Sequence, residues 1–439
     1  MKNSVSVKQT LLDLISEMEQ YRWLFVRNPL TDFTRVKKWT FSETLKFMIT
    51  MQGNSLKTEL YNYFGFCEGT PTNSSFNQRR AQILPEAFEF LFREFTRTLD
   101  QKLYRGYRLL ACDGSKLCIA RNPEDKSTYF QSLPTSKGFN QLHLNTFYDL
   151  MSHTYTDAVI QPARQENEYK AMCDMIDRYG GDKNAIFIAD RGYENYHIFA
   201  HAREHGQYYL IRAKDLLSNG IVSSLKDQLP IDTESFDQIV AVTLTRKQTN
   251  EVKNNPQKYR IIMKKTPFDY LDLYDNPFYD LQMRIVRFPI SETTYECIIT
   301  NLPSDEFTPE DIKELYHMRW GIETSFRELK YAIGLTSFHA KKMDYLKQEI
   351  WARLTLYNCC EAIIMNTAIA KSAEPTRYTY QINYTQAIRI CRYFLTIKEG
   401  VPPDVENLIS RELLPVRPGR KDPRKVKNQA AVSFLYRVA

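Results

Sequence analysis

Apolar residues recur at helical spacing through the first hundred residues of the chain. SETLKFMITMQGNSLKTELYNYF (42–64) has this pattern, and TPTNSSFNQRRAQILPEAFEFLFREF (70–95) follows it. In the second segment, Asn73, Ser74 or Ser75 is the expected cap of a short polar helix. The pattern predicts a helical N-terminal domain over residues 1–100.

From about residue 105 the chain changes to short apolar runs. YRLLACDGSKLCIA (107–120) predicts a buried strand, a turn and a second strand. Two further strands follow, and helical and strand patterns then alternate as far as residue 214. This order is typical of an α/β fold with a mixed sheet flanked by helices. We assign this core to residues 101–214 and 306–372.

Residues 215–305 return to strand-like runs, separated by polar, turn-rich stretches such as PFDYLDLYDNPFYD (267–280). The stretch is too long for one crossover connection, so it predicts a β-rich insertion into the sheet domain. A helix then begins with Thr308 as its cap, Pro309 at its first position and Asp311 three residues after the cap. Residues 373–439 complete the chain as a helical region with a basic tail.

Two apolar strands are each followed directly by an aspartate and, soon after, a glycine. LLACDG carries Asp113, and IFIADRG carries Asp190. Ligands of open α/β sheets bind at the carboxyl ends of the strands, and a carboxylate there needs a positive partner. Each aspartate could instead cap the turn that follows it, but the matched pair favours a shared site.

The segment LYHMRWGIETSFRELKYAIGL (315–335) predicts a helix with two distinct faces. At about 100° per residue, five polar side chains fall in a stripe under about 90° wide. This stripe contains Tyr316, Arg319, Glu323, Arg327 and Lys330. The apolar face contains Met318, Ile322, Phe326, Leu329 and Ile333. A solvated, salt-bridged edge is the alternative, but it gives no reason for Tyr316.

Three carboxylates that meet at one point favour hard divalent cations with oxygen ligands. Two Mg²⁺ ions about 4 Å apart would stabilise the attacking and leaving oxygens of a phosphoryl transfer. We therefore predict that Asp113, Asp190 and Glu323 bind the metal. The flanking Tyr316, Arg319, Arg327 and Lys330 would hold the phosphates of a nucleic acid.

Charge supports a polyanionic partner but does not establish one. The chain has 59 Lys and Arg against 52 Asp and Glu, a net charge of +7. Arg420 and Arg424 lie in the basic tail, which either contacts DNA or serves solubility. Arg79 and Arg80 on the short N-terminal helix either contact DNA or belong to an ordinary polar face.

The eight cysteines contain no C-x-x-C pair, which predicts reduced thiols in a cytosolic protein. No apolar run is long enough for a membrane helix and no signal peptide is present, so we expect a cytoplasmic, nucleoid-associated bacterial protein. His197, His201 and His205 share one helix face and could bind zinc. Without a Glu beside the first His, exposed surface histidines are the favoured interpretation. His143 is predicted to be a buried strand residue.

In its motifs, the chain resembles the DDE transposases of bacterial insertion sequences, in the branch called family four. That branch carries the signature Y-x2-R-x3-E-x6-K, which reads here as Tyr316, Arg319, Glu323 and Lys330. The two acids before it match Asp113 and Asp190. The resemblance implies a ribonuclease-H-like core with the β-rich insertion before the glutamate and helical regions at both ends.

The resemblance also implies cut-and-paste transposition with two Mg²⁺ ions per active site, for which Mn²⁺ can substitute. One strand is cut at each transposon end, and the freed 3′-OH forms a hairpin that is reopened before transfer into target DNA. A homodimer would pair the terminal inverted repeats of double-stranded DNA, which Arg212 and Lys214 contact. Relatives stack a flipped base on a tryptophan of the insertion, whereas this insertion offers only Tyr and Phe.

Two other functions are compatible with these motifs. One is a catalytically inactive, transposase-derived DNA-binding protein, although all three acids and the whole signature are present. The other is a ribonuclease-H-like nuclease that hydrolyses DNA without strand transfer. The joining reaction distinguishes the second alternative from a transposase.

Overall fold

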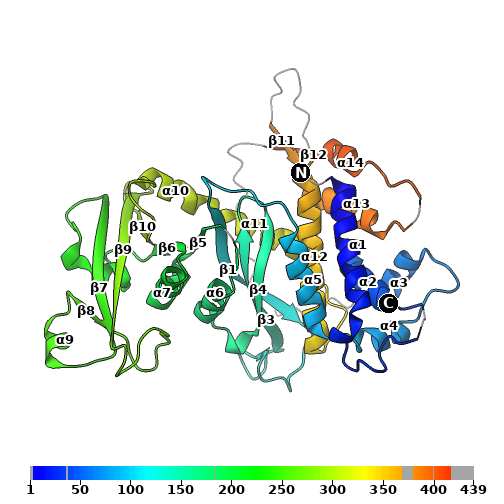
Figure 1. The fold of residues 1–439 in the computed structure, drawn as a ribbon, viewed down its shortest axis with the longest axis horizontal. Helices are drawn as coiled ribbons and strands as arrows, with labels where there is room; N and C mark the ends of the chain where they lie inside the picture. The colour runs from blue at the N-terminus through cyan, green and yellow to red at the C-terminus, as the bar shows by residue number, and fades with distance from the viewer. Residues whose placement is uncertain (1–2, 36–37, 182, 368–378, 399, 417–439) are drawn as a thin grey trace.

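The computed structural model describes residues 3–35, 38–181, 183–367, 379–398 and 400–416. It forms an elongated arrangement with strands at one end, a mixed sheet in the middle and helices at the other end (Figure 1). Among the described residues, no helix combines the length and apolar character needed to cross a membrane.

The N-terminal region is helical, as its pattern predicts. Its α-helices are α1 (Ser4–Gln20), α2 (Phe41–Thr50), α3 (Leu56–Phe64), α4 (Asn73–Arg80) and α5 (Pro85–Arg97). The cap of α4 is Thr72, whose side chain accepts the backbone N–H of Ser75, and not one of the three residues expected. Thr72 lies in the extended conformation that a cap requires, whereas Asn73 is already helical.

The central sheet has one continuous hydrogen-bonded path, β2-β3-β1-β5-β6-β10-β9-β7-β8, with β4 also paired to β3. Its first strands are β1 (Arg108–Ile119), β2 (Tyr129–Phe130), β3 (Phe139–Asp149), β4 (Thr154–Pro162), β5 (Ala185–Ala189) and β6 (Tyr208–Ala213). β4, β3 and β1 are antiparallel, while β1, β5 and β6 are parallel. Three antiparallel strands followed by two parallel ones make a ribonuclease-H-like core.

The expected turn after Asp113 is absent, because β1 continues without interruption to Ile119. The antiparallel partner β3 explains this, since it pairs with β1 from Asp149 opposite Leu110 to Asn140 opposite Ile119. Only the parallel pairing with β5 stops at this point, where Cys112 faces Ala189. Asp113 therefore lies in the middle of one long strand, at the end of its pairing with β5.

The β-rich stretch after β6 extends the same sheet. Its strands are β7 (Phe236–Thr245), β8 (Tyr259–Ile261), β9 (Phe278–Pro289) and β10 (Tyr295–Thr300), accompanied by the short helices α8 (Ile221–Ser224) and α9 (Asn250–Asn254). β10 pairs with β6 and β9 in antiparallel register. The stretch is rich in strands, as predicted, and hydrogen bonds join it directly to the core.

Two hydrophobic cores lie on opposite faces of the sheet, because successive strand residues point to opposite sides. Leu109, Ala111 and Ile188 pack on one face, with α1, α2, α5 and the helices after the insertion. Leu110 and Phe187 pack on the other face, with α6 (Glu168–Asp177) and α7 (Tyr196–Glu204), which lie side by side in Figure 1. We call these the α11 face, after the helix α11 (Trp320–Tyr331) that packs on it, and the α6–α7 face.

The helices after the insertion are α10 (Pro309–Met318), α11 (Trp320–Tyr331) and α12 (Met343–Ile364). The capping box of Thr308 and Asp311 forms as predicted. The predicted single helix is divided at Arg319, which separates α10 from α11. α12 is buried along most of its length and packs against α5, α2 and β4, so it joins the N-terminal helices to the sheet.

The C-terminal region contains α13 (Tyr384–Thr396) and α14 (Val405–Arg411), as its helical pattern predicts. It also contains a small unpredicted sheet, in which β11 (Thr379–Ile382) pairs with β12 (Leu413–Val416). α13 packs against α12 and α2, so the two helical ends of the chain are packed together.

Candidate functional site

Asp113 and Asp190 lie at the same level on neighbouring parallel segments, where the pairing of β1 with β5 ends. Their preceding residues, Cys112 and Ala189, are the last pair in the register of β1 and β5. Neighbouring strands lie about 4.8 Å apart. In an extended chain, residues two positions apart point to the same face. Asp113 therefore shares the face of Ala111, and Asp190 shares that of Ile188, which is the α11 face for both.

Glu323 reaches this face from α11. The helix packs into the core through Ile322, Phe326 and Leu329, which leaves Glu323 half-buried beside them. The Glu323 carboxylate accepts a hydrogen bond of 2.9 Å from Nη2 of Arg319. The fold thus brings a third carboxylate, distant in sequence, to the face of the two aspartates.

Arg319 is the buried cation that links the three acids. Its side chain is only 3% exposed, and its positive charge interacts with Asp190 and Glu323 as well as with Asp113. Its Nε has no hydrogen-bond partner among the described residues. A buried guanidinium N–H without a partner is costly, so this atom is available to an anion that enters the site.

The raised pKa of Asp113 indicates that a positive charge would stabilise its carboxylate. Burial, aided by the carboxylates of Glu323 and Glu168, raises the pKa of Asp113 to about 6, against the lowering effect of the Gly114 N–H and the Arg319 charge. The Gly114 N–H donates to Asp113 Oδ1 at 2.8 Å. Carboxylates crowded in this way favour the binding of a cation.

Glu168 is a neighbour that the sequence did not reveal. It begins α6, and its Oε1 lies 3.0 Å from Nε2 of the buried His143 on β3. A Cβ atom on Gly114 would lie 2.6 Å from Glu168 Oε1 and 2.3 Å from His143 Nε2, so only glycine fits here. His143 is a buried strand residue, as predicted. No local pattern marks Glu168, because the packing of α6 beside the sheet creates the contact.

Tyr316 lies buried at the edge of the acidic cluster. Its hydroxyl has no hydrogen-bond partner among the described residues, and burial raises its pKa. The guanidinium groups of Arg319 and Arg212 lie 5.5 and 6.0 Å from its ring centroid. Arg212 is also paired with Glu296 at 2.9 Å. The orphaned hydroxyl is thus a second polar group available to a ligand.

Of the other predicted cations, Lys330 has a charge interaction with the cluster, whereas the side chains of Arg327 and Lys214 are exposed. Burial lowers the pKa of Lys330, and the charge of Asp113 acts on it in the opposite sense, which places the half-buried ammonium near the acids. The backbone N–H of Lys214 donates to Glu194 at 2.9 Å, which holds the chain there.

The two arginines of α4, Arg79 and Arg80, lie in different environments. Arg80 is fully buried, paired with Glu349 at 3.0 Å and bonded to the Tyr345 carbonyl oxygen, so the predicted DNA contact of Arg80 is wrong for this structure. Arg79 is half-buried against Phe33, and its contact with DNA stays a prediction. Arg420 and Arg424 lie outside the described residues.

In this conformation the three predicted metal ligands are neighbours but do not converge on one point. Among the described residues, two groups of His, Cys or acidic side chains have ligand atoms within 4.8 Å of one another, and neither contains Asp113, Asp190 or Glu323. The Glu323 carboxylate instead forms an ion pair with Arg319. The all-carboxylate donor set and the raised pKa of Asp113 nevertheless fit a hard divalent cation.

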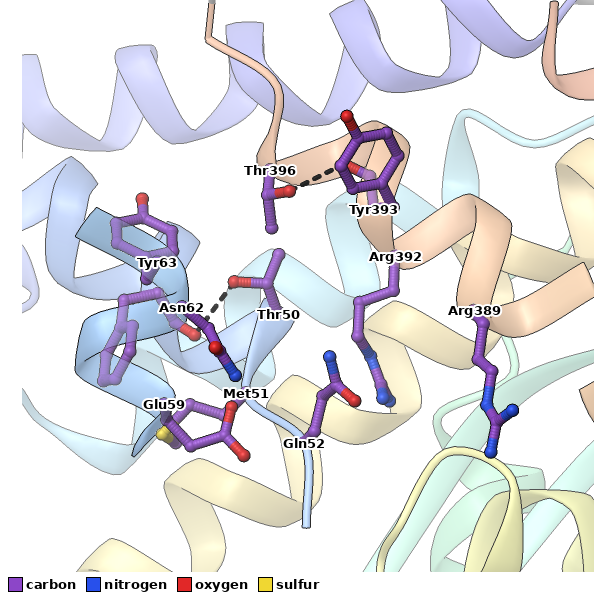
Figure 2. A pocket seen from close by; sticks show the side chains of 11 residues that line it. Thr50, Met51, Gln52, Glu59, Asn62, Tyr63, Arg389, Arg392, Tyr393 and Thr396 are labelled. Carbon is purple, nitrogen blue, oxygen red and sulfur yellow. Dashed lines mark hydrogen bonds between the residues drawn. The ribbon is translucent and has the colours of Figure 1, made fainter. Parts of the chain in front are cut away.

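A cavity of about 200 Å³ lies elsewhere, between α2, α3 and α13 (Figure 2). Glu59, Arg389 and Arg392 line it together with polar and aromatic side chains. None of the carboxylates on the α11 face contributes to its walls. The acidic cluster, and not this cavity, is therefore the candidate reaction site.

The strand order and the acidic face define a protein of the ribonuclease-H-like class. Residues 104–359 match the family model described as "Transposase DDE domain", which covers more than half of the chain. The chain belongs to this family. The matched range contains Asp113, Asp190 and the helix that carries Glu323.

Curated relatives of the chain are transposases of bacterial insertion sequences. A putative transposase InsL for IS186A from Escherichia coli K12 is 37% identical over 57 residues, which are 13% of this chain and 15% of that protein. The transposase InsG for IS4 from the same strain is 26% identical over 135 residues, 28% of this chain and 29% of that protein. The matched stretches thus span less than a third of either relative.

A similar solved structure is a piggyBac transposase in a synaptic complex with hairpin DNA. Its TM-score is 0.44 at 10% sequence identity, and the alignment covers 96% of this chain and 87% of that one.

Proposed function

We propose that this protein is a cut-and-paste DNA transposase that cleaves DNA at the ends of its element and joins them to target DNA. The observation that supports this proposal most directly is the placement of Asp113, Asp190 and Glu323 on one face of the sheet, around the buried Arg319. Family membership supports the same chemistry.

Asp113, Asp190 and Glu323 would hold two divalent cations, Mg²⁺ or Mn²⁺. When bound, these ions would activate the attacking oxygen and stabilise the departing one in a phosphoryl transfer. Their charge would also offset the burial and the carboxylate repulsion that together raise the pKa of Asp113. The ion pair with Arg319 engages Oε1 of Glu323, so an ion would bind this carboxylate through Oε2.

The surrounding side chains position the phosphodiester. Arg319 would bind a phosphate oxygen through its unpartnered Nε, and Tyr316 would donate its orphaned hydroxyl to the same backbone. Lys330, Arg327 and Lys214 would track the phosphates on either side. Arg212 would join them once released from Glu296.

A hairpin intermediate requires a flipped base, and the insertion offers two exposed aromatic rings for stacking. Tyr274 is 87% exposed and Phe278 is 40% exposed, whereas Phe268 and Tyr279 are buried. The carboxylate of Asp272 accepts a hydrogen bond of 2.7 Å from the backbone N–H of Tyr274 and so stabilises the turn that carries this ring. We propose Tyr274 as the stacking residue, within a homodimer that pairs two element ends.

The test is a cleavage and joining assay with the purified protein, Mg²⁺, and DNA carrying the inverted repeats that flank its reading frame. Asp113→Asn, Asp190→Asn and Glu323→Gln should each abolish cleavage and joining while end binding persists. Glu314→Gln, an exposed glutamate on α10, is the matched control and should react normally. Cleavage that survives in any one of the three acid variants contradicts the assigned site.

The reaction products separate the remaining alternatives. Cleaved ends without joined products identify a nuclease, and binding without cleavage in the wild-type protein identifies an inactive DNA-binding protein. If hairpin ends form, Tyr274→Ala should reduce them, whereas Tyr331→Ala, an exposed ring at the end of α11, should not.

A further inference from the structure

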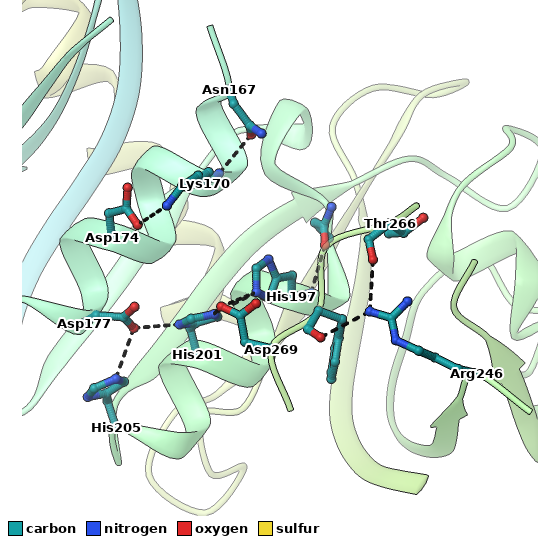
Figure 3. Close-up of polar contacts among 12 residues, drawn as sticks. Asn167, Lys170, Asp174, Asp177, His197, His201, His205, Arg246, Thr266 and Asp269 are labelled. Atoms are coloured by element: carbon teal, nitrogen blue, oxygen red, sulfur yellow. Dashed lines mark hydrogen bonds and ion pairs between the residues drawn. The ribbon is translucent and has the colours of Figure 1, made fainter. Parts of the chain in front are cut away.

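A second cluster of ligating side chains lies on the α6–α7 face, away from the acidic site. His197 and His201 project from α7, and Asp269 comes from the loop between β8 and β9 (Figure 3). Cys173 comes from α6. Contrary to the prediction of exposed surface histidines, His197 and His201 are buried. Two buried imidazoles that face each other need a specific explanation.

The ligating atoms of this cluster converge. Nε2 of His197 and Nε2 of His201 are 2.8 Å apart, and each lies 3.3 Å from Oδ2 of Asp269. One ligating atom each from Cys173, His197 and His201 lies within 4.8 Å of the other two, and Asp269 joins this group through the two imidazoles. Two nitrogens, one sulfur and one oxygen are donor types of a tetrahedral zinc site, and a bound ion would replace the hydrogen bond between the imidazoles and move their nitrogens to about 3.3 Å apart.

A second layer of contacts orients the imidazole of His201. Its Nδ1 lies 2.6 Å from Oδ1 of Asp177, which also contacts Nε2 of His205 at 3.1 Å. A carboxylate on Nδ1 fixes the proton there and leaves the lone pair of Nε2 directed toward His197 and Asp269. This arrangement is typical of metal-binding histidines, and Figure 3 shows the whole chain of contacts.

The loop that supplies Asp269 is held in place independently. Arg246 donates hydrogen bonds to the carbonyl oxygens of Met263, Thr266 and Phe268. The ring of Phe268 packs beside His197 with centroids 5.9 Å apart, and the carboxylate of Asp269 follows directly. Asp269 is therefore presented to the histidines by an anchored turn.

The electrostatic environment also suits a cation. Burial raises the pKa of the Cys173 thiol, and the carboxylates of Asp177 and Asp269 raise it further. Burial and the neighbouring His201 lower the pKa of His197, so its imidazole is held neutral, as a metal ligand must be. A bound dication would remove the repulsion that opposes the thiolate.

We propose that Cys173, His197, His201 and Asp269 form a structural binding site for zinc or a similar borderline transition-metal ion. The site lies on the opposite sheet face from the acidic cluster and differs from it in donor chemistry. It would join three segments that are far apart in sequence: α6, α7 and the loop of the insertion.

The site would also fix the insertion loop that carries Tyr274, five residues after Asp269. Of the four ligands, Asp269 is the only one contributed by this loop, so removal of the metal should loosen the loop before the rest of the sheet. Limited proteolysis can follow this loosening directly.

The decisive experiment uses the full chain, stripped with a chelator and reconstituted with Co²⁺ alone. Wild-type protein should bind one tightly held Co²⁺ with a thiolate charge-transfer band and tetrahedral d–d absorption. Cys173→Ser should lose the charge-transfer band, whereas Cys67→Ser, at an exposed cysteine, should keep it. Co²⁺ in the acidic cluster would give no thiolate band, so the two sites are distinguishable.

Two measurements on the wild-type protein need no variant. The purified, dialysed protein should retain about one zinc per chain, and chelation should accelerate protease cleavage within residues 263–277. Wild-type protein that gives no thiolate band with Co²⁺ would overturn the proposal. In that outcome the two imidazoles share a proton in an ordinary hydrogen bond.

Discussion

The two faces of the central sheet carry polar clusters of opposite character. The α11 face gathers half-buried carboxylates that crowd Asp113, with Arg319 as a buried cation among them. The α6–α7 face gathers buried imidazoles and a thiol, joined to the carboxylate of Asp269. One sheet thus separates a hard, oxygen-only site from a nitrogen and sulfur site.

The difference shows what each site is suited to do. Oxygen ligands bind Mg²⁺ weakly and leave positions open for substrate and water, as a reaction centre requires. Nitrogen and sulfur ligands bind zinc tightly, and a site closed by four protein ligands serves stability. Changes to the two faces should therefore affect different properties of the protein.

The largest expected effect is the loss of catalysis on the α11 face. Asp190→Asn and Glu323→Gln should lower the rate of Mg²⁺-dependent cleavage by roughly 10³-fold or more, because each removes an oxygen ligand needed for transition-state stabilisation. Single-turnover cleavage of end DNA measures the rate. Glu314→Gln should cleave at close to the wild-type rate, and an equal loss of rate in that variant would contradict a specific role for the acidic cluster.

Next in size is the loss of stability on the α6–α7 face. His201→Ala should lower the unfolding midpoint of the zinc-loaded protein by several degrees, since a bound metal contributes about 4 kcal/mol at 1,000 times its dissociation constant. Differential scanning calorimetry with and without a chelator measures this change. In the chelated protein the deficit should shrink; an undiminished deficit would mean that His201 acts through packing alone.

A smaller effect concerns Asp113 and pH. Its pKa rises from 3.8 to about 6 on folding, so the folded protein is penalised as pH rises through this range. Asp113→Asn should therefore stabilise the metal-free protein by up to about 3 kcal/mol at pH 7.5 and by little at pH 4. Denaturant unfolding at the two pH values measures the difference.

Added Mg²⁺ provides the control for this prediction. It should stabilise the wild-type protein at pH 7.5 and reduce the advantage of Asp113→Asn, because the ion replaces the missing positive charge. A stabilisation that is the same at both pH values would contradict the electrostatic explanation.

The smallest expected effect is on DNA binding at the edge of the acidic face. Lys214→Ala should reduce the slope of log affinity against log salt concentration by about 0.9, the value for one phosphate contact. Fluorescence anisotropy at several salt concentrations gives the slope. Lys253→Ala, exposed on α9 at the far end of the sheet, should leave the slope unchanged (Figure 1).

Local elements and their apolar faces could be predicted from the sequence. The cap at Thr308 predicted the start of α10, and helical spacing predicted one helix where the structure has α10 and α11. Apolar runs predicted strands before Asp113 and Asp190, although β1 continues past Asp113. Side-chain periodicity and caps are set by neighbours in the chain, so they can be read locally. The resemblance to DDE transposases followed from the same spacings, and the family match confirmed it.

Which of these local faces come into contact depends on tertiary packing and could not be predicted from the sequence. It placed both aspartates and Glu323 on one side of the sheet, buried Arg80 against Glu349, and closed His197 and His201 against Asp269. Each result depends on contacts between segments separated by many residues. Periodicity shows which side of a helix or strand is apolar, but not which partner covers it, because that choice is made by packing of the whole chain.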